Sequence, residues 1–167
     1  ADRAERSTAQ GAIVVRTSEG KAAMVQLLCE TDFVAMSDEY LALANSVADK
    51  LLAGDISAED KELPEIKEAV LKLGENIQIG EVKLFEAANI GEYVHSNRKI
   101  GVLVSLSAGD PEVAKDVAMH VAATNPRVIS PDEISNDLVE KEKAIWEEQL
   151  KNEGKPAEIL DKIMMGK

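Results

Sequence analysis

The first part of the chain alternates apolar runs with a turn signal. Residues 12–29 carry two apolar runs separated by Ser18-Glu19-Gly20-Lys21, which predicts an antiparallel hairpin. In the second run both faces are largely apolar, with Val25, Leu27 and Cys29 on one and Met24, Gln26 and Leu28 on the other. Apolar character on both faces is typical of a strand in the centre of a sheet.

Helical spacing follows this hairpin. Residues 37–53 predict a helix that begins at a Ser37 cap and ends at Gly54. Its apolar face consists of Leu41, Ala44, Val47, Ala48 and Leu51. A second helix is predicted from about Pro64 to Leu73, ending at Gly74. The strand that follows, with Ile77, Ile79, Val82 and Leu84, loses its alternation at Gly80-Glu81, which predicts a β-bulge.

The pattern of hairpin followed by helix then returns. Residues 90–106 predict a second hairpin with its turn at Ser96-Asn97-Arg98-Lys99, and Asp110-Pro111 predicts the start of a helix that Pro126 ends. Ser130-Pro131-Asp132-Glu133 is a capping-box pattern. The segments Val47-Ala48-x-x-Leu51 and Val117-Ala118-x-x-Val121 match, which suggests two related α+β subdomains. Because the match is short and hydrophobic, a chance likeness stays the alternative.

The end of the chain predicts a helical hairpin, with one arm at about 135–153 and a link at Gly154-Lys155-Pro156. The first arm repeats apolar residues seven positions apart, in the pairs Leu138 and Ile145, and Val139 and Trp146. Such a seam packs either within the hairpin or against a partner, and both interpretations stay open.

One loop differs between the two copies of the repeat. The first copy carries an extra stretch between its strand and its helix, and this stretch contains Cys29-Glu30-Thr31-Asp32-Phe33-Val34-Ala35. Loops of this kind often carry function. Phe33 has two interpretations: it packs into the chain's own core, or it projects toward a partner, where aromatic side chains supply much of the binding energy.

Composition narrows the function classes. The 167 residues include 19 Lys and Arg and 31 Asp and Glu, giving a formal charge of −12, which argues against binding nucleic acid or an anionic membrane. The only cysteine, Cys29, excludes an internal disulfide and favours a reducing compartment. The apolar runs are shorter than a membrane span needs.

Motifs of covalent chemistry are missing from the sequence. Neither a P-loop nor the G-x-G-x-x-G, H-E-x-x-H or G-x-S-x-G pattern occurs. His95 lies near the turn of the second hairpin, and His120 is expected to be packed or to face a partner rather than to be catalytic. Cys29 is expected to be a small buried hydrophobe. The residues therefore favour an acidic α+β protein that binds another protein, rather than an enzyme.

Several segments resemble the elongation factor Ts family. They occur in the family's order and are Cys29-Glu30-Thr31-Asp32-Phe33-Val34-Ala35, Gly74-Glu75-Asn76-Ile77, Tyr93-Val94-His95 with Ile100-Gly101-Val102-Leu103-Val104, Ala118-Met119-His120-Val121-Ala122-Ala123 and Gly154-Lys155-Pro156. The resemblance implies a guanine-nucleotide exchange factor that promotes GDP release from the translation GTPase elongation factor Tu. It implies no catalytic residue, no metal site, no cofactor, and no direct contact with nucleic acid or membrane.

The resemblance also assigns roles to residues. Phe33 corresponds to the side chain that enters the GTPase domain and disturbs its Mg²⁺ and phosphate site, with Asp32 and Val34 beside it. Ile100 and Gly101 match the family's contact strand, where glycine lets another backbone approach closely. His120 matches a helix histidine that faces the GTPase.

The expected organisation is a linker at 1–11, an N-terminal core subdomain at 12–88, a C-terminal core subdomain at 89–134 and a helical hairpin at 135–167. The resemblance implies that the C-terminal subdomain is incomplete and that the chain is a core fragment. It further implies a bacterial cytoplasm or an organellar matrix, with the hairpin as a dimerisation element or a monomer's own module. Two other functions stay open: a module that binds the GTPase without stimulating exchange, and a small-molecule enzyme built around His95 or His120.

Overall fold

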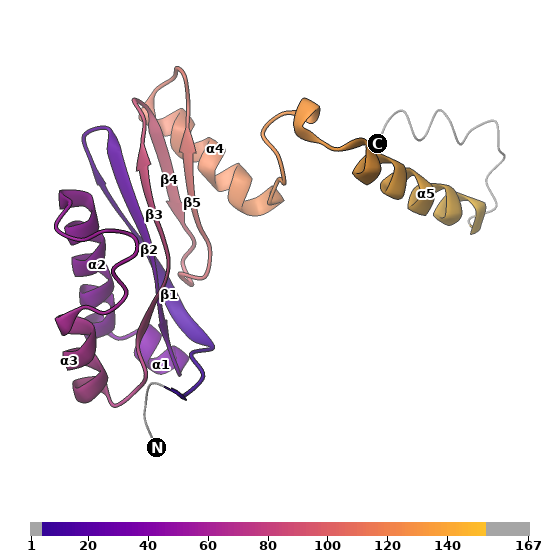
Figure 1. Cartoon of the computed structure of the whole chain (residues 1–167). Coiled ribbons are helices and arrows are strands. Elements are labelled where there is room, and N and C mark those ends of the chain that lie inside the picture. Colours follow the sequence, from indigo (N-terminus) through magenta and orange to yellow (C-terminus); the bar gives the residue numbers. More distant parts are fainter. Residues whose placement is uncertain (1–4, 153–167) are drawn as a thin grey trace. The chain divides into compact units, whose positions relative to one another are not determined.

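The first part of the structure is a three-stranded antiparallel sheet. The computed structural model describes residues 5–152, and the chain divides into two compact units, residues 1–125 and 126–167 (Figure 1). In the first unit, β1 (Gln10–Ser18), β2 (Lys21–Cys29) and β3 (Gln78–Glu86) pair in the order β1-β2-β3. The predicted first hairpin and the central place of its second strand are therefore confirmed.

The predicted bulge lies in β3. Val25 faces Val82 and Leu27 faces Ile79, so Gly80 and Glu81 together oppose one residue of β2. That residue is Gln26, whose side-chain oxygen accepts the Glu81 N–H at 3.2 Å. The bulge changes which face the later residues of β3 occupy, as the broken alternation in the sequence indicated.

The single helical turn α1 (Asp32–Ala35) and two longer helices, α2 and α3, complete this part, which we call the three-stranded layer (β1–β3 with α1–α3). In α2 (Asp38–Ala53), the Ser37 hydroxyl accepts from the backbone N–H of Tyr40, and Gly54 ends the helix in the left-handed conformation. α3 (Pro64–Leu73) ends in the same way at Gly74. Both helices have the predicted bounds. They lie on one side of the sheet in Figure 1.

The main core lies between α2, α3 and the sheet. Its fully buried larger side chains are Tyr40, Leu27, Val14, Val25, Val47 and Cys29. The predicted apolar face of α2 is confirmed, with Leu41 only partly buried at its margin. Tyr40 also belongs to this face, although the predicted apolar face did not include it.

A second hairpin and helix form what we call the two-stranded layer. β4 (Ile90–Val94) and β5 (Gly101–Ser105) pair in an antiparallel sheet, and α4 (Pro111–Thr124) packs on them. Asp110 caps α4 by accepting the Val113 N–H, as predicted. A Cβ atom at Gly91 would lie 2.0 Å from the Ala114 carbonyl oxygen, so glycine permits the helix to approach β4 this closely.

The loop between β4 and β5 joins the two layers. The Ile13 N–H of β1 donates to the Arg98 carbonyl at 2.8 Å. Lys99 donates from Nζ to Gln10 Oε1 at 2.8 Å and to the Gly11 carbonyl at 3.0 Å. These contacts place the start of β5 beside the start of β1.

The second unit, as far as it is described, contains a short 3₁₀ turn at Pro131–Glu133 and the helix α5 (Asn136–Asn152). Ser130 caps only the short turn, and the hydroxyl of Ser135 accepts from Leu138 at the start of α5. α5 corresponds to the predicted first arm. The predicted link and second arm lie outside the described residues.

The architecture is α+β, built from antiparallel hairpins and helices, as the sequence predicted. The four predicted segments of the chain, and the boundaries between them, stay predictions. Among residues 5–152, every helix is too short or too polar to cross a membrane.

Candidate partner-binding site

The extra loop of the first repeat folds into a single helical turn, α1 (Asp32–Ala35). It connects the end of β2 to α2. The Thr31 side chain caps it by accepting the Val34 N–H at 3.3 Å. At its other end, the Ser37 hydroxyl donates to the Val34 carbonyl at 2.8 Å. A helix of four residues is unstable in isolation, so these contacts and packing must hold it.

Phe33 projects from this turn into solvent. It is 84% exposed, whereas Ala35 on the opposite side is buried in the core and Val34 packs partly against it. Of the two interpretations of Phe33, packing into its own core is therefore wrong. Met36, directly after α1, is also exposed, so the turn presents a small apolar surface with Asp32 beside it.

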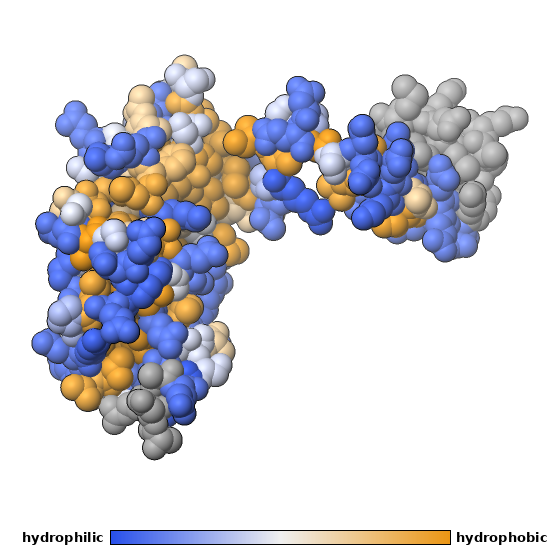
Figure 2. All heavy atoms as spheres, viewed as in Figure 1, coloured by the Kyte–Doolittle hydropathy of each residue, from blue (hydrophilic) through white to orange (hydrophobic). Residues whose placement is uncertain are grey.

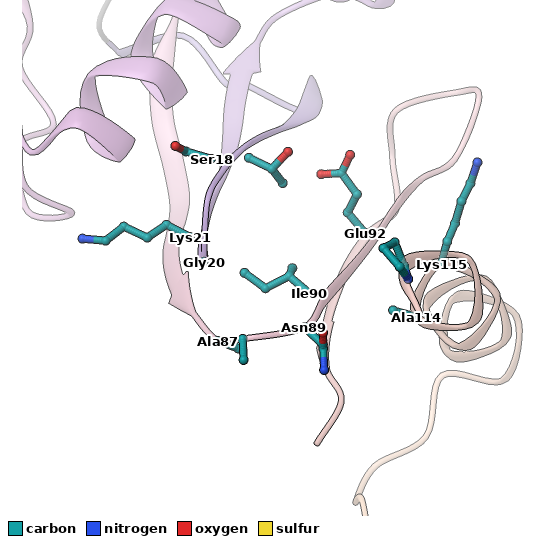
Figure 3. A pocket seen from close by; sticks show the side chains of 12 residues that line it. Ser18, Gly20, Lys21, Ala87, Asn89, Ile90, Glu92, Ala114 and Lys115 are labelled. Atoms are coloured by element: carbon teal, nitrogen blue, oxygen red, sulfur yellow. The ribbon is translucent and has the colours of Figure 1, made fainter. Parts of the chain in front are cut away.

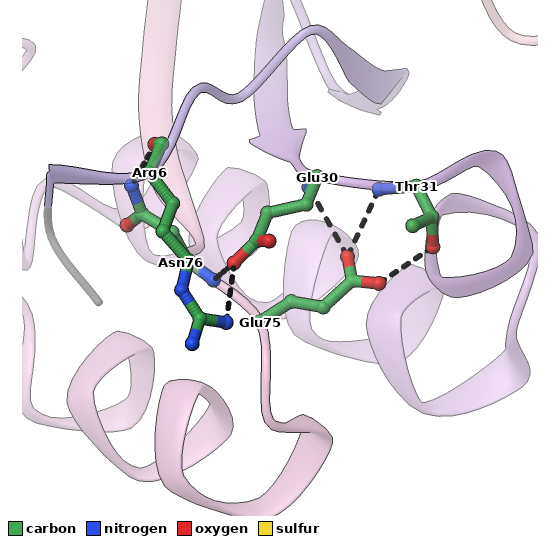
Figure 4. A network of polar contacts seen from close by, with 5 residues as sticks. All are labelled: Arg6, Glu30, Thr31, Glu75 and Asn76. Atoms are coloured by element: carbon green, nitrogen blue, oxygen red, sulfur yellow. Dashed lines mark hydrogen bonds and ion pairs between the residues drawn. The ribbon is translucent and has the colours of Figure 1, made fainter. Parts of the chain in front are cut away.

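A carboxylate from another segment binds the backbone in front of α1 (Figure 4). Glu75, just after the end of α3, accepts the N–H groups of Glu30 and Thr31 at 3.1 and 3.0 Å. It also accepts the Thr31 hydroxyl proton at 2.6 Å. The sequence reasoning quoted Glu75 only as part of a family motif and assigned it no role. An acidic residue directly after a glycine helix cap was the available signal.

Ile100 and Gly101 lie where the loop between β4 and β5 meets β1. Ile100 is 43% exposed. A Cβ atom on Gly101 would come within 2.6 Å of Ile13 Cγ2 and 2.9 Å of Met24 Sδ. The small size of Gly101 is thus required by contacts inside the chain, which supplies a reason for glycine that the sequence reasoning did not consider.

The two histidines occupy separate, exposed positions. His120 is on α4, a different element from α1 and β5. His95 follows β4, and its Nδ1 lies 2.8 Å from the Tyr93 hydroxyl. Lys99, directly before Ile100, contacts Gln10, and Gln10 pairs with Cys29 at the end of β2, shortly before α1. Ile100 and Gly101 are thereby connected to the end of the sheet at which α1 begins. His120 lies on a different element, α4.

Cys29 behaves as a packed side chain. It is completely buried and its Sγ donates to the Thr31 carbonyl at 3.1 Å. Burial is the main cause that raises the pKa of the Cys29 thiol, which disfavours the nucleophilic thiolate. The expectation of a small buried hydrophobe is confirmed.

A hollow of about 410 Å³ lies between the tip of the first hairpin and the two-stranded layer (Figure 3). Glu92 lines it, and partial burial raises the pKa of this carboxyl while the positive charges of Arg16 and Lys115 act against the shift. The ammonium groups of Lys21 and Lys115 point away from the hollow in Figure 3. Neither histidine lines it. Within the described part of the chain, no three His, Cys, Asp or Glu side chains gather as metal ligands would.

Comparison with known proteins identifies the family. The family model described as elongation factor TS matches residues 30–167. The chain is 45% identical to elongation factor Ts of Shewanella piezotolerans over 170 residues and 43% identical to that of Saccharophagus degradans over 176 residues, with all of this chain covered in both. It is 41% identical to elongation factor Ts of Hydrogenobaculum sp. over 180 residues, with 99% of this chain covered.

The chain spans 60%, 61% and 66% of the length of these three relatives. The matched range contains α1 with its exposed Phe33, the Glu75 contact, the β4–β5 hairpin and α4. From the matched range and these identities, the chain belongs to the elongation factor Ts family.

Proposed function

We propose that this chain promotes release of GDP from elongation factor Tu by inserting Phe33 into the GTPase. The observation that carries the proposal is an aromatic side chain 84% exposed on a helical turn that is fixed at both ends. An exposed phenylalanine is unfavourable in water and gains most by entering an apolar gap. That the chain belongs to the elongation factor Ts family supports elongation factor Tu as the partner.

Exchange of this kind requires binding energy rather than covalent chemistry. A protein that binds the GTPase more tightly without GDP must, by thermodynamic linkage, lower the affinity for GDP by the same factor. Asp32 and Val34 flank Phe33 on the same turn and would form the edge of the contact. Under this proposal the chain acts as an exchange factor and has no catalytic residue of its own.

The proposed further contacts are Ile100 and Gly101 at the start of β5 and, separately, His120 on α4. Ile100 and His120 offer exposed side chains, and Val113 and Met119 on α4 are exposed apolar residues as well. Figure 2 shows hydrophobic atoms gathering over the layer of β4, β5 and α4. An apolar surface of this kind suits a protein partner rather than a nucleic acid, in keeping with the net charge of −12.

The deciding experiment measures release of a fluorescent GDP analogue from elongation factor Tu with this chain in catalytic amount. We expect acceleration by the unaltered chain and a loss of roughly 30-fold or more for Phe33→Ala, the size of effect typical of a central aromatic contact. Leu71→Ala is the matched control, since Leu71 is 76% exposed on α3 and lies outside the proposed contact.

Three results separate the alternatives. Acceleration that Phe33→Ala greatly reduces and Leu71→Ala preserves supports the proposal. Capture of nucleotide-free elongation factor Tu without acceleration favours the binding module that does not stimulate exchange. Neither binding nor acceleration by a folded chain rejects the proposal.

A further inference from the structure

Two chain segments that are remote in sequence are tied together at the N-terminal end of α1. One is Glu30 and Thr31 at the end of β2, and the other is Glu75 and Asn76 after α3 (Figure 4). The Glu75 carboxylate accepts three hydrogen bonds from the first segment, from two backbone N–H groups and one hydroxyl. The 2.6 Å contact with the Thr31 hydroxyl has the short length expected when the acceptor is ionised.

The Glu30 carboxylate makes the reciprocal contact with the second segment. Glu30 Oε1 accepts the backbone N–H of Asn76 at 2.7 Å and lies 3.5 Å from Arg6 Nη1. The side-chain amide of Asn76 in turn donates to the Arg6 carbonyl at 2.7 Å. Each glutamate therefore accepts from the backbone of the other segment, and the Arg6 cation offsets part of the repulsion between the two negative charges.

The Thr31 hydroxyl passes this constraint to α1. A hydroxyl has one proton and two lone pairs. Because the proton is donated to Glu75, the lone pairs are left to accept the Val34 N–H, which caps the turn that carries Phe33. The orientation of the cap, and with it the start of α1, therefore depends on Glu75.

We propose that Glu75 is a positioning residue that holds α1 in one conformation, so that Phe33 is presented ready for insertion. This inference rests on the proposed function for its consequence in nucleotide exchange, but the positioning itself is a property of the free chain. A surface that is already ordered avoids the conformational entropy of ordering it on binding. A chain in which only a fraction of molecules has the competent conformation binds more weakly by that fraction.

The first test is amide hydrogen exchange of Glu75→Gln in the whole chain. Glutamine has one side-chain acceptor oxygen in place of two, and its amide group would face hydrogen-bond donors. We expect the Thr31 and Val34 amides to exchange roughly tenfold faster while the Val47 amide in the core keeps its rate. Unchanged exchange at both Thr31 and Val34 would overturn the proposal.

Glu68→Gln is the matched control because it makes the same change of charge on the neighbouring helix. Glu68 is exposed on α3, and its side chain forms no hydrogen bond or ion pair within residues 5–152. We expect it to leave the Thr31 and Val34 amides unaltered. Equal acceleration of both amides by Glu68→Gln would show that the local negative charge, and not the contacts of Glu75, decides the exchange, and would reject the proposal.

The second test uses the fluorescent GDP analogue. Glu75→Gln should raise the concentration of chain that gives half-maximal acceleration, with the maximal rate preserved. In a Phe33→Ala background the same substitution should have no further effect, because Glu75 acts through the turn that carries Phe33. An equal loss in both backgrounds would mean a general structural role and would contradict the proposal.

Thr31 provides a test that leaves Glu75 intact. Thr31→Ser keeps the hydroxyl and should preserve the protection of the Val34 amide, whereas Thr31→Val removes the hydroxyl and should accelerate its exchange. Equal protection of the Val34 amide in both variants would show that the Thr31 hydroxyl does not connect Glu75 to α1, and would overturn the proposal. If the unaltered chain failed to accelerate GDP release, the proposed function would fall, and the amide measurements would still decide the positioning role.

Discussion

The three-stranded and the two-stranded layer share a pattern of small residues on the helix, but the side chains around these residues are buried to different extents. Ala44 and Ala48 of α2 and the repeat-matched Ala114 and Ala118 of α4 are all completely or almost completely buried against their sheets. Around the first pair, large side chains from three strands and two helices close a continuous core. Around the second pair, the strands of β4 and β5 remain half-buried.

This difference shows that the sequence pattern of a helix determines which of its faces packs on the sheet, whereas the number of neighbouring strands and helices determines how deeply the side chains of that face are buried. Small residues at matched positions seat each helix on its hairpin in both layers. The two-stranded layer has no third strand in the described part of the chain, and Val113 and Met119 of its helix remain exposed. A two-stranded hairpin with one helix removes less apolar surface from water, so each of its side chains contributes less to stability.

The sharpest way to break this comparison is to delete the same side chain at matched positions. When Val25-x-Leu27 is aligned with Val104-x-Leu106, Leu27 of β2 matches Leu106 beyond β5. Leu27 is completely buried, whereas Leu106 is half-buried. We expect Leu27→Ala to lower the free energy of unfolding by about 3 kcal/mol and Leu106→Ala by less than about 1.5 kcal/mol. Urea unfolding followed by circular dichroism measures both, and equal losses would show that burial does not distinguish the layers.

Gly91 tests the seating of α4 directly. A Cβ atom there would meet the backbone of Ala114, which cannot rotate away, so Gly91→Ala must displace the helix. We expect a loss of about 1–3 kcal/mol and faster amide exchange in α4, with α2 unaffected. Gly80→Ala is the control, because its Cβ would meet the flexible end of Gln26. Loosening of α2 to the same extent as α4 would show that the layers do not respond separately.

The smallest expected effects come from one acid in each layer, and their signs are opposite. A hydrogen bond from Lys50 of α2 is the main cause that lowers the pKa of Glu65 in α3. The ionised form is thus favoured in the folded state, and its contribution exists above the unfolded pKa and is lost as the pH falls through the folded pKa. We expect Glu65→Gln to reduce stability at neutral pH by ~0.5 kcal/mol, since the pair is partly exposed.

Glu92 in the two-stranded layer should behave in the reverse way. Because partial burial raises its pKa, its protonated form is favoured in the folded state, and that advantage disappears as the pH rises through the folded pKa. Glu92→Gln should therefore raise the melting temperature slightly at neutral pH, and the gain should vanish in acid. Thermal melts of both variants across pH 3–7, a range that is roughly centred on the usual pKa of glutamate, check the pair. Shifts of the same sign would contradict the assignment.

Local interactions made much of the fold predictable from the sequence. The caps at Ser37, Gly54, Gly74 and Asp110 act within a few residues, and the structure has helix ends at each of them. The broken alternation at Gly80-Glu81 likewise placed the bulge, because alternation is a property of one strand. The loop that carries Phe33 was also marked in the sequence, since it is extra to the repeat.

Contacts between remote segments were decided only by the tertiary structure. The exposure of Phe33 depends on which faces of α1 the core covers, and the sequence left both interpretations open. The bond between Thr31 and Glu75 spans 44 residues, and no periodic pattern relates them. The close packing of Gly101 on Ile13 and Met24 depends in the same way on how one hairpin meets another. Periodicity and helix caps depend on residues close together in the sequence, so the sequence alone determines them. The hydrogen bonds of Glu75 to Glu30 and Thr31 form only after folding has brought the end of β2 and the end of α3 together.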